Sequence, residues 1–351
     1  MDEAAKQAMR EHYNQHAVVG RDSREANASR HRGRAYPLKN FHNGVKRALL
    51  RRFAAGTASL LDLCCGRGGD LKKWWDVGVQ YVCGIDLAEQ EVAEAISRYN
   101  TMLESNRKRP GGHLMQADFF PYGSLGDKRL EWDRQFEVAT CMFAIHYFFV
   151  REAAIKMFLT NVAAALQPGG HFIATFPDGK RVLWALKGRP EFRSEMLTLK
   201  RCWEGDPRCF GSAYNMAIAD TVTEGGDGSL EYLVFFNALL GVARQCGLVP
   251  VEAYGDADLD AKFWDEDRGK PVKHFKPPFK AELEGDRSLA TASEIFCCVV
   301  FRKALPAAGG SRFPATAGGK RPAEAATAGP AGPDAKKPRA AGRAPPDYSD
   351  L

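Results

Sequence analysis

Apolar and amphipathic blocks alternate from residue 59 to residue 176. Short apolar runs predict buried strands, and the longer amphipathic blocks between them predict helices. The expected strands cover 59–64, 80–85, 113–117, 136–142 and 171–176, and the expected helices cover 70–77, 88–106 and 151–166. Strands that alternate with helices predict an α/β fold with a doubly wound, mostly parallel sheet and helices on both faces.

The flanking segments continue the pattern less strongly. Phe41, Val45, Leu49 and Phe53 recur at helical spacing with charged residues opposite, which predicts an amphipathic helix lying on the core. After residue 196 the pattern predicts strands at 213–218, 230–235, 249–254 and 294–301, and a helix at 235–246. No internal repeat is evident, so these elements are expected to complete the same globular domain.

Composition divides the 351 residues into three parts. Residues 1–56 form a basic N-terminal segment with its helix, and residues 57–303 form the α/β domain. Residues 304–351 are rich in alanine, glycine and proline, and we expect a disordered basic tail because so little apolar surface offsets the entropy of ordering. Its clusters at 320–321 and 336–339 resemble a bipartite nuclear import signal and predict a nuclear protein; a basic tail with no targeting role is the alternative.

Several classes of protein are excluded by hydropathy, charge and cysteine spacing. No apolar stretch approaches the roughly 20 residues that cross a bilayer, so no membrane association is expected. Residues 1–10 contain acids and no apolar core, which argues against a secretory signal. With no secretory signal, the nine cysteines are expected in a reducing compartment, and because they form no C-x-x-C pair, no metal site is expected. The net charge of +6 favours an anionic partner.

A glycine-rich loop follows the first expected strand. Residues 62–70 read Asp-Leu-Cys-Cys-Gly-Arg-Gly-Gly-Asp, and the glycines permit a tight turn close to a ligand. Asp86 ends the second strand 20 residues after Gly66, where an acid can bind a ribose diol, and Asp118 ends the third strand, where it can meet an adenine edge. Ligands bind at the carboxyl ends of such strands, so the pattern predicts a nucleotide-type ligand.

The spacing of the glycines bears on which ligand this is. Gly66, Gly68 and Gly69 fit the G-x-G-x-x-G fingerprint of dinucleotide enzymes poorly, which disfavours an NAD-dependent oxidoreductase. S-adenosylmethionine, which has no pyrophosphate, suits the loop better, and Lys46 is placed to neutralise its carboxylate. The alternatives at this point are a turn that merely joins strand to helix and, for the acids, turn or helix caps.

Further motifs, read in order, are typical of one enzyme family. They are Phe41–Lys46, Asp62–Leu71, Gln116–Asp118, Cys141–Tyr147, Pro168–Asp178 and Glu231–Val234. On these motifs the chain resembles the mRNA cap guanine-N7 methyltransferases, class I S-adenosylmethionine-dependent enzymes, from about His12–Asn14 to Phe301. The resemblance implies a seven-stranded Rossmann-like sheet with cap-binding insertions. It also implies methyl transfer from S-adenosylmethionine to N7 of the guanosine cap at the 5′ end of mRNA.

The resemblance also assigns residues. It implies that the methyl donor is bound by Lys46, Cys64, Gly66, Asp70, Asp86, Asp118, Met142 and Tyr147. It implies that the cap is bound by His42, Asn43, Arg67, Lys73, Arg98, Phe143, His146, Pro177, Glu231 and Phe296. Among these positions, Cys64 replaces the family's usual glycine, Met142 a glutamine and Phe296 a tyrosine.

These residue types suit the chemistry. Guanine N7 offers a lone pair and carries no proton, so in-line displacement needs alignment and electrostatics but no general base. Glu231 is expected to accept hydrogen bonds from the guanine N1–H and 2-amino groups and to offset the charge that grows on the purine, while His146 and Tyr147 flank the base. The expected triphosphate ligands are Arg67, Lys73 and Arg98.

Alternatives remain open at this stage. A small-molecule S-adenosylmethionine-dependent methyltransferase shares the loop and acids but gives no reason for the basic N-terminal segment or for residues 231–234. A catalytically weak cap- or RNA-binding protein finds support in Cys64 and Met142. His146 as an ordinary buried histidine and Glu231 as a surface acid are the structural alternatives. The expected partner is the capped RNA 5′ end, with other capping enzymes or an activating subunit as further candidates, and a monomer is expected. The role of residues 255–290 is left open.

Overall fold

The computed structural model describes residues 3–16, 33–107, 115–221, 228–279 and 287–305. These residues belong to one unit of the chain, Met1–Leu305, and the second unit, Pro306–Leu351, lies outside the described residues. The predicted disordered tail and its basic clusters therefore stay predictions, as does the three-part division of the chain. No helix in the described ranges is long and apolar enough to span a membrane.

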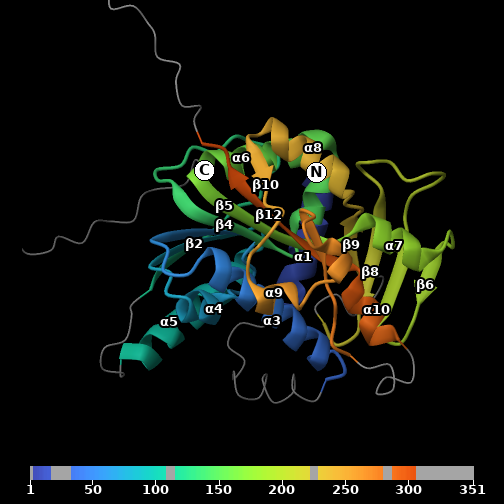
Figure 1. The fold of residues 1–351 in the computed structure, drawn as a ribbon, viewed down its shortest axis with the longest axis horizontal. Helices are drawn as coiled ribbons and strands as arrows, with labels where there is room; N and C mark the ends of the chain where they lie inside the picture. The colour runs from blue at the N-terminus through green and yellow to red at the C-terminus, as the bar shows by residue number, and fades with distance from the viewer. Residues whose placement is uncertain (1–2, 17–32, 108–114, 222–227, 280–286, 306–351) are drawn as a thin grey trace, which may run out of the picture. The chain divides into compact units, whose positions relative to one another are not determined.

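A central sheet forms the core of the unit (Figure 1). Its strands, in spatial order, are β10 (Leu248–Pro250), β12 (Phe296–Lys303), β5 (Leu166–Pro177), β4 (Phe136–Met142), β1 (Ser59–Leu63), β2 (Tyr81–Asp86) and β3 (Gln116–Pro121). The five strands from β5 to β3 are parallel, whereas β12 runs antiparallel to β5 and β10. A short eighth strand, β11 (Val272–His274), pairs with β12. The mostly parallel, doubly wound sheet is confirmed.

Helices cover both faces because neighbouring residues of a strand point to opposite sides of the sheet. Leu60 packs in one apolar cluster and the adjacent Leu61 in the other. The first cluster includes side chains of α3 (Tyr36–Phe53), α4 (Leu71–Asp76), α5 (Glu89–Arg107) and α10 (Ser288–Glu294). The second includes side chains of α6 (Glu152–Ala165) and α8 (Phe236–Gln245). The predicted amphipathic helix thus lies on the core as α3, with Val45 and Leu49 fully buried.

A second, antiparallel sheet is inserted between β5 and α8. It contains β6 (Glu191–Arg193), β7 (Leu197–Arg201), β8 (Ala213–Ile218) and β9 (Ser229–Tyr232), and α7 (Gly179–Leu186) leads into it. The prediction of β8 is confirmed. The prediction at 230–235 is shifted, since the strand is β9 and α8 begins at Phe236. The pattern did not predict β6, β7 or α7, which are short.

Two other strands differ in their boundaries from the predictions. The third strand was predicted at 113–117, of which residues 113 and 114 lie outside the described residues. In the described part the strand is Gln116–Pro121, and it continues past residue 117 because β2 offers pairing partners as far as Asp86, which is opposite Pro121. Asp118 therefore lies within β3 and does not follow it. The strand expected at 249–254 is only Leu248–Pro250. The N-terminal α1 (Glu3–His16), the 3₁₀ turns η1 (Ile145–Val150) and η2 (Asp265–Asp267), and α9 (Ala257–Asp260) are further elements.

Candidate functional site

The glycine-rich loop is tied to the second strand by Asp86. The backbone N–H of Gly66 donates to Asp86 Oδ2 at 2.8 Å, and the N–H of Ala88 donates to Oδ1 at 2.9 Å. Burial raises the pKa of this carboxyl to about 6, although the backbone N–H groups oppose the shift. The carboxyl ends of β1 and β2 thus meet at Asp86, whose role in binding a ribose stays a prediction.

Two strained backbone positions lie at the carboxyl ends of β1 and β4. Cys64 has φ +66° and Phe143 has φ +61°, a region that favours glycine. The backbone N–H of Cys64 donates to the Ile85 carbonyl at 2.7 Å, and that of Phe143 donates to Thr175 Oγ1 at 2.9 Å. Strain of this kind concentrates at functional sites. At position 64, where the resemblance implies a glycine, this backbone conformation strains the cysteine.

Lys46, Asp70 and Lys73 form a buried charge cluster beside the loop. Lys46 Nζ lies 2.7 Å from Asp70 Oδ2, and Lys73 Nζ lies 2.7 Å from Oδ1. Burial alone would raise the pKa of Asp70, but the two ammonium groups lower it to about 2. Lys46 also lies 5.3 Å from the centre of the Phe143 ring. Helix α3 is thereby joined to the loop and to the end of β4.

The three cations predicted to hold the triphosphate are each engaged with a carboxylate. Arg67 donates twice to Glu91, at 2.6 and 3.1 Å. Arg98 lies 2.7 Å from Glu94, its neighbour on α5. Lys73 is only 4% exposed and also donates to the Gly69 carbonyl at 2.9 Å. The structure therefore does not gather these side chains into an open cradle.

Asp118 is also engaged elsewhere. Its Oδ2 accepts a hydrogen bond from the Tyr81 hydroxyl at 2.9 Å, and the Arg134 guanidinium lies 4.3 Å from the centre of the Tyr81 ring. Asp118 pairs with Cys83, three positions before the Asp86–Pro121 pair at the end of the two strands. The structure does not join it to the loop by any described contact.

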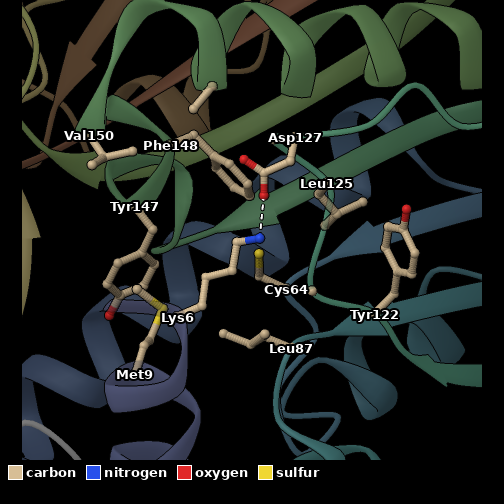
Figure 2. Close-up of a pocket in the computed structure, with 13 residues that line it drawn as sticks. Lys6, Met9, Cys64, Leu87, Tyr122, Leu125, Asp127, Tyr147, Phe148 and Val150 are labelled. Atoms are coloured by element: carbon tan, nitrogen blue, oxygen red, sulfur yellow. Dashed lines mark ion pairs between the residues drawn. The ribbon is translucent and has the colours of Figure 1, made fainter. Parts of the chain in front are cut away.

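A cavity of about 60 Å³ opens at the carboxyl ends of β1 and β2, beside α1 (Figure 2). Cys64 and Leu87 line it from the sheet, Tyr147 lines it from η1, and Lys6 and Met9 line it from α1. Lys6 Nζ lies 2.5 Å from Asp127 Oδ2, the ion pair dashed in Figure 2. The remaining lining side chains are mostly apolar: Tyr122, Leu125, Phe148, Val150 and Ala154.

Tyr13 of α1 contacts a predicted site residue, Tyr147, and was not itself predicted. Its hydroxyl hydrogen-bonds the hydroxyl of Tyr147, and the two rings meet edge to face with centroids 6.4 Å apart. Burial raises the pKa of Tyr13, and nearby Glu231, Asp86 and Cys64 raise it further. Tyr13 therefore joins α1 to Tyr147, near enough to Glu231 and Asp86 for both carboxyls to raise its pKa. The available signal was the triplet His12–Asn14, at which the resemblance begins.

Glu231 is a buried carboxyl held by two hydroxyl donors. Tyr214 donates to Oε2 at 2.9 Å and Ser229 donates to Oε1 at 2.8 Å, while the side chain is only 2% exposed. Burial raises its pKa to about 7, and the two hydrogen bonds limit the rise. The alternative of a surface acid is thereby excluded. Sequence reasoning missed Tyr214, because its pairing with Glu231 across β8 and β9 leaves no local signal. It also missed Ser229, although this residue lies two positions before Glu231 on β9.

His146 faces Glu231 without a hydrogen bond. Its Nε2 lies 3.8 Å from Glu231 Oε2, and neither ring nitrogen has a hydrogen-bond partner among the described residues. Burial lowers the pKa of the imidazole to about 3, so the ring is neutral at physiological pH. Buried polar atoms usually have partners, and an orphaned pair beside a carboxylate indicates a ligand that supplies them.

An aromatic cluster gathers several predicted cap residues. His42 stacks on Phe143 with ring centroids 5.3 Å apart, and Phe275 and Phe296 meet His42 edge-on at 5.2 and 5.0 Å. His42 Nε2 lies 2.9 Å from Ser293 Oγ, and burial with nearby Lys46 lowers its pKa to about 3. Phe275 belongs to the segment 255–290, whose role the sequence left open. Its ring packs against His42, Phe143 and Phe296, which are predicted site residues.

The remaining predicted residues lie around this cluster. Pro177 ends β5 and pairs with Phe296 across the sheet. Met142 is buried, and its sulfur accepts from the Thr175 hydroxyl at 3.8 Å. Asn43 is half-buried on α3. In the described ranges, no group of three or more histidine, cysteine, aspartate or glutamate side chains is arranged to hold a metal ion.

Comparisons with known proteins all identify one family of methyltransferases. A model of the mRNA (guanine-N(7))-methyltransferase domain matches residues 1–295. A Drosophila melanogaster protein named mRNA cap guanine-N(7) methyltransferase is 30% identical over 68% of this chain and 57% of its own length. An Arabidopsis thaliana protein named mRNA cap guanine-N(7) methyltransferase 1 is 35% identical over 70% of this chain and 67% of its own. The chain thus spans little more than half of the fruit-fly relative.

Proposed function

Because the chain belongs to the mRNA (guanine-N7)-methyltransferase family, we propose that it transfers the methyl group of S-adenosylmethionine to N7 of the guanosine cap of mRNA. One observation carries the proposal for this chain. A buried carboxyl held by two donors, Glu231, faces the orphaned nitrogens of His146. The ring of Tyr147 packs against His146, and Tyr147 lines the same cavity as Cys64 of the loop. The pair of Glu231 and His146 fits the edge of a guanine, and the adjoining loop with Asp86 fits a methyl donor that contains a nucleoside.

The donor half fits S-adenosylmethionine by its chemistry. The Asp86 carboxylate offers acceptors for a ribose diol, the Lys46 ammonium offers a charge for an amino-acid carboxylate, and Cys64 and Leu87 line an apolar wall. Bound there, the sulfonium supplies an electrophilic methyl group. The donor contacts proposed for Gly66, Asp70, Met142 and Asp118 follow the family pattern, and that of Asp118 requires it to exchange its bond with Tyr81.

The acceptor half fits guanine. The ionised Glu231 can accept from the guanine N1–H and 2-amino groups with lone pairs that Tyr214 and Ser229 leave open. Neutral His146 can donate a hydrogen bond to the base or accept one from it. The stacked rings of His42 and Phe143, in the aromatic cluster, offer a flat apolar surface for the base. The carboxylate also opposes the positive charge that develops on the purine during transfer, which stabilises the transition state.

No residue needs to act as a general base, since N7 carries no proton. The chain's contribution is to align the lone pair with the methyl carbon and to exclude water. We assign the triphosphate to Arg67 and Arg98, which reach the surface and can exchange their carboxylate partners for phosphate oxygens. Buried Lys73 contributes by holding Asp70.

The cellular setting belongs to the proposal as well. The capped RNA 5′ end is the macromolecular partner, and other capping enzymes or an activating subunit are candidates. A nuclear location is supported by the basic clusters at 320–321 and 336–339, and a fluorescent fusion that loses nuclear accumulation when both clusters become alanine would support it. We propose a monomer, which sedimentation can test.

The function is tested by methyl transfer with purified full-length protein. The substrates are methyl-labelled S-adenosylmethionine with guanosine-capped RNA, uncapped RNA of the same sequence, or a panel of small amines and phenols. Label recovered as 7-methylguanosine only from capped RNA is the expected result. Transfer to the small molecules alone would replace the proposal with a small-molecule methyltransferase, and cap binding without donor binding would replace it with an inactive cap-binding protein.

A further inference from the structure

Basic residues are concentrated next to the guanine-facing carboxylate. Residues 179–203, which form α7, β6, β7 and their connections, contain seven lysines and arginines and two glutamates. Both glutamates are engaged, Glu191 with Arg193 and Glu195 with Arg34. This segment of 25 residues thus contributes a formal charge of +5 to a chain whose net charge is +6.

Aromatic rings alternate with these cations. Lys187 lies over the Trp184 ring, Arg189 over Phe192 and Arg201 over Trp203, each cation 5.8 Å from the ring centre. Trp184 is 66% exposed, the highest value among the large apolar side chains of residues 33–303 that are described as exposed. Exposed tryptophan is unusual and, rimmed by cations, marks a binding surface.

Backbone hydrogen bonds bring these residues together. The Arg189 N–H donates to the Leu186 carbonyl at 3.0 Å, which closes the turn after α7. The Arg201 N–H donates to the Pro190 carbonyl at 2.8 Å, which places the end of β7 beside that turn. Figure 1 shows α7 next to β6. We call this surface the tryptophan patch; it consists of Trp184, Lys187, Arg189, Phe192, Arg201 and Trp203.

The strand register connects the tryptophan patch to the guanine-facing carboxylate. Arg201 of β7 pairs with Tyr214 of β8, and Tyr214 pairs with Glu231 of β9. Directly paired residues of antiparallel strands have Cα atoms about 5 Å apart and side chains on one face. The Cα atoms of Arg201 and Glu231 are therefore about 10 Å apart. Tyr214, which donates to the Glu231 carboxylate, lies between them on the same face of the sheet.

The cations of the tryptophan patch differ from those nearer the loop. Arg67, Lys73 and Arg98 each pair with a carboxylate. No ion pair with a carboxylate joins Lys187, Arg189 or Arg201 to another residue in the described part of the chain. The Arg189 Nε–H donates to the Leu186 carbonyl at 3.3 Å, which leaves its terminal N–H groups for phosphate oxygens. Guanidinium and ammonium groups that rest on aromatic rings can still donate to phosphate at their edges.

We propose that the tryptophan patch binds the single-stranded RNA that follows the cap. This inference rests on the proposed function. Bases stack on the rings of Trp184 and Trp203. Lys187, Arg189 and Arg201 contact the backbone phosphates. Stacking on aromatic rings tolerates any base and phosphate contacts carry no sequence information, so the surface recognises a 5′ leader of any sequence. The patch thereby favours capped RNA over a free capped dinucleotide.

The test compares two substrates of one enzyme. Full-length protein and the double variant Trp184→Ala/Arg189→Gln methylate either a capped dinucleotide or a capped 20-nucleotide RNA of unstructured sequence. The matched control is Ile96→Ala/Lys270→Gln, which removes an exposed apolar side chain and an exposed cation elsewhere. For the patch variant, KM for the long RNA is expected to rise about tenfold, since loss of one stacked base alone has an effect of this size. KM for the dinucleotide and kcat on both substrates are expected to stay within twofold.

Salt dependence supplies a second readout. The slope of log KM against log salt for the long RNA should fall by about 0.7 when Arg189 loses its charge, the value for one phosphate contact on a single strand. Equal changes on both substrates, or none on the long RNA, would overturn the inference. The inference would also be overturned if the patch variant bound RNA normally but was no longer stimulated by an acidic protein partner.

Failure of the proposed function gives a different result. If the wild-type protein methylates neither substrate, the function fails, and the patch is then tested by fluorescence anisotropy with an uncapped 20-nucleotide RNA. The patch predicts that the same double variant weakens this binding about tenfold relative to wild type, whereas the control variant does not. Equal RNA binding by wild type and patch variant would refute it.

Discussion

Replacing Glu231 with glutamine should uncouple activity from stability. Burial raises the pKa of Glu231 from the ordinary value of 4.5 to about 7. The folded chain therefore binds the proton of Glu231 more tightly than the unfolded chain does. The contribution of this group to the free energy of unfolding is complete below pH 4.5 and is lost as the pH rises through 7. A shift of this size corresponds to about 3 kcal/mol at pH 8, because each pKa unit is worth about 1.4 kcal/mol.

Glutamine keeps the shape of the side chain and removes its titration. At pH 8 we expect Glu231→Gln to unfold about 5 °C above wild type, with the difference shrinking below pH 6. Transfer to the cap should fall about 100-fold or more, because an amide offers one acceptor where the guanine edge presents two donors, and hydrogen bonds to a charged group are worth about 1.5–3 kcal/mol. Wild-type kcat/KM should rise with pH through about 7, and the variant should lack this limb.

Thermal unfolding by circular dichroism and initial rates, both from pH 5.5 to 8.5, measure the two effects. Tyr214→Phe removes a donor that lowers the pKa of Glu231, so its rate profile should move to higher pH. His146, Tyr147 and Tyr13 also face this carboxyl and stay uncharged over the range. Glu252→Gln, at an exposed carboxylate, is the control. A Glu231→Gln variant that melts below wild type at pH 8, or that keeps the wild-type pH profile, would refute the reasoning.

Three further substitutions probe the donor half. Tyr13→Phe removes the hydroxyl bonded to Tyr147, and calorimetry should show about fivefold weaker S-adenosylmethionine binding, the value of one neutral hydrogen bond; unchanged affinity would contradict the role of α1. Asp86→Ala should weaken donor binding at least tenfold in the same titration while the variant retains its near-ultraviolet spectrum; tight binding would remove Asp86 from the site. Cys64→Gly should raise the melting temperature by a few degrees, because relief of the strain at φ +66° is worth about 1 kcal/mol; a lower melting temperature would show that the thiol contributes more than the strain costs.

The central sheet was predictable because its inner strands are buried on both faces. Strands such as Ser59–Leu63 appear as continuous apolar runs, and four of their five residues are buried. The edge strand Gln116–Pro121 is half exposed and mixes polar with apolar residues, so its boundaries were shifted and Asp118 was misplaced. The short strands β6 and β7 are mostly charged on their outer positions, and they gave no run long enough to recognise.

The acids proposed for the site could be singled out from the sequence more easily than the residues that they contact. Asp86 and Glu231 stand in motifs, whereas Tyr13 reaches Tyr147 across 134 positions and Arg67 reaches Glu91 across 24. Such pairs depend on how the helices pack on the sheet, and one sequence contains no local signal for them. The predicted phosphate cradle was incomplete for this reason: sequence reveals a cation but not the carboxylate that it meets.

The most direct test of the account is cap discrimination by Glu231. Inosine differs from guanosine only in lacking the 2-amino group, so an inosine cap offers the carboxylate one donor fewer. The account predicts that wild-type protein places its label at N7 of the guanosine cap and uses the inosine cap at least tenfold less efficiently in kcat/KM, the value of one hydrogen bond to a charged acceptor. It also predicts that Glu231→Gln no longer distinguishes the two caps. Equal use of both caps by the wild-type protein would contradict the assignment of Glu231 to the guanine edge.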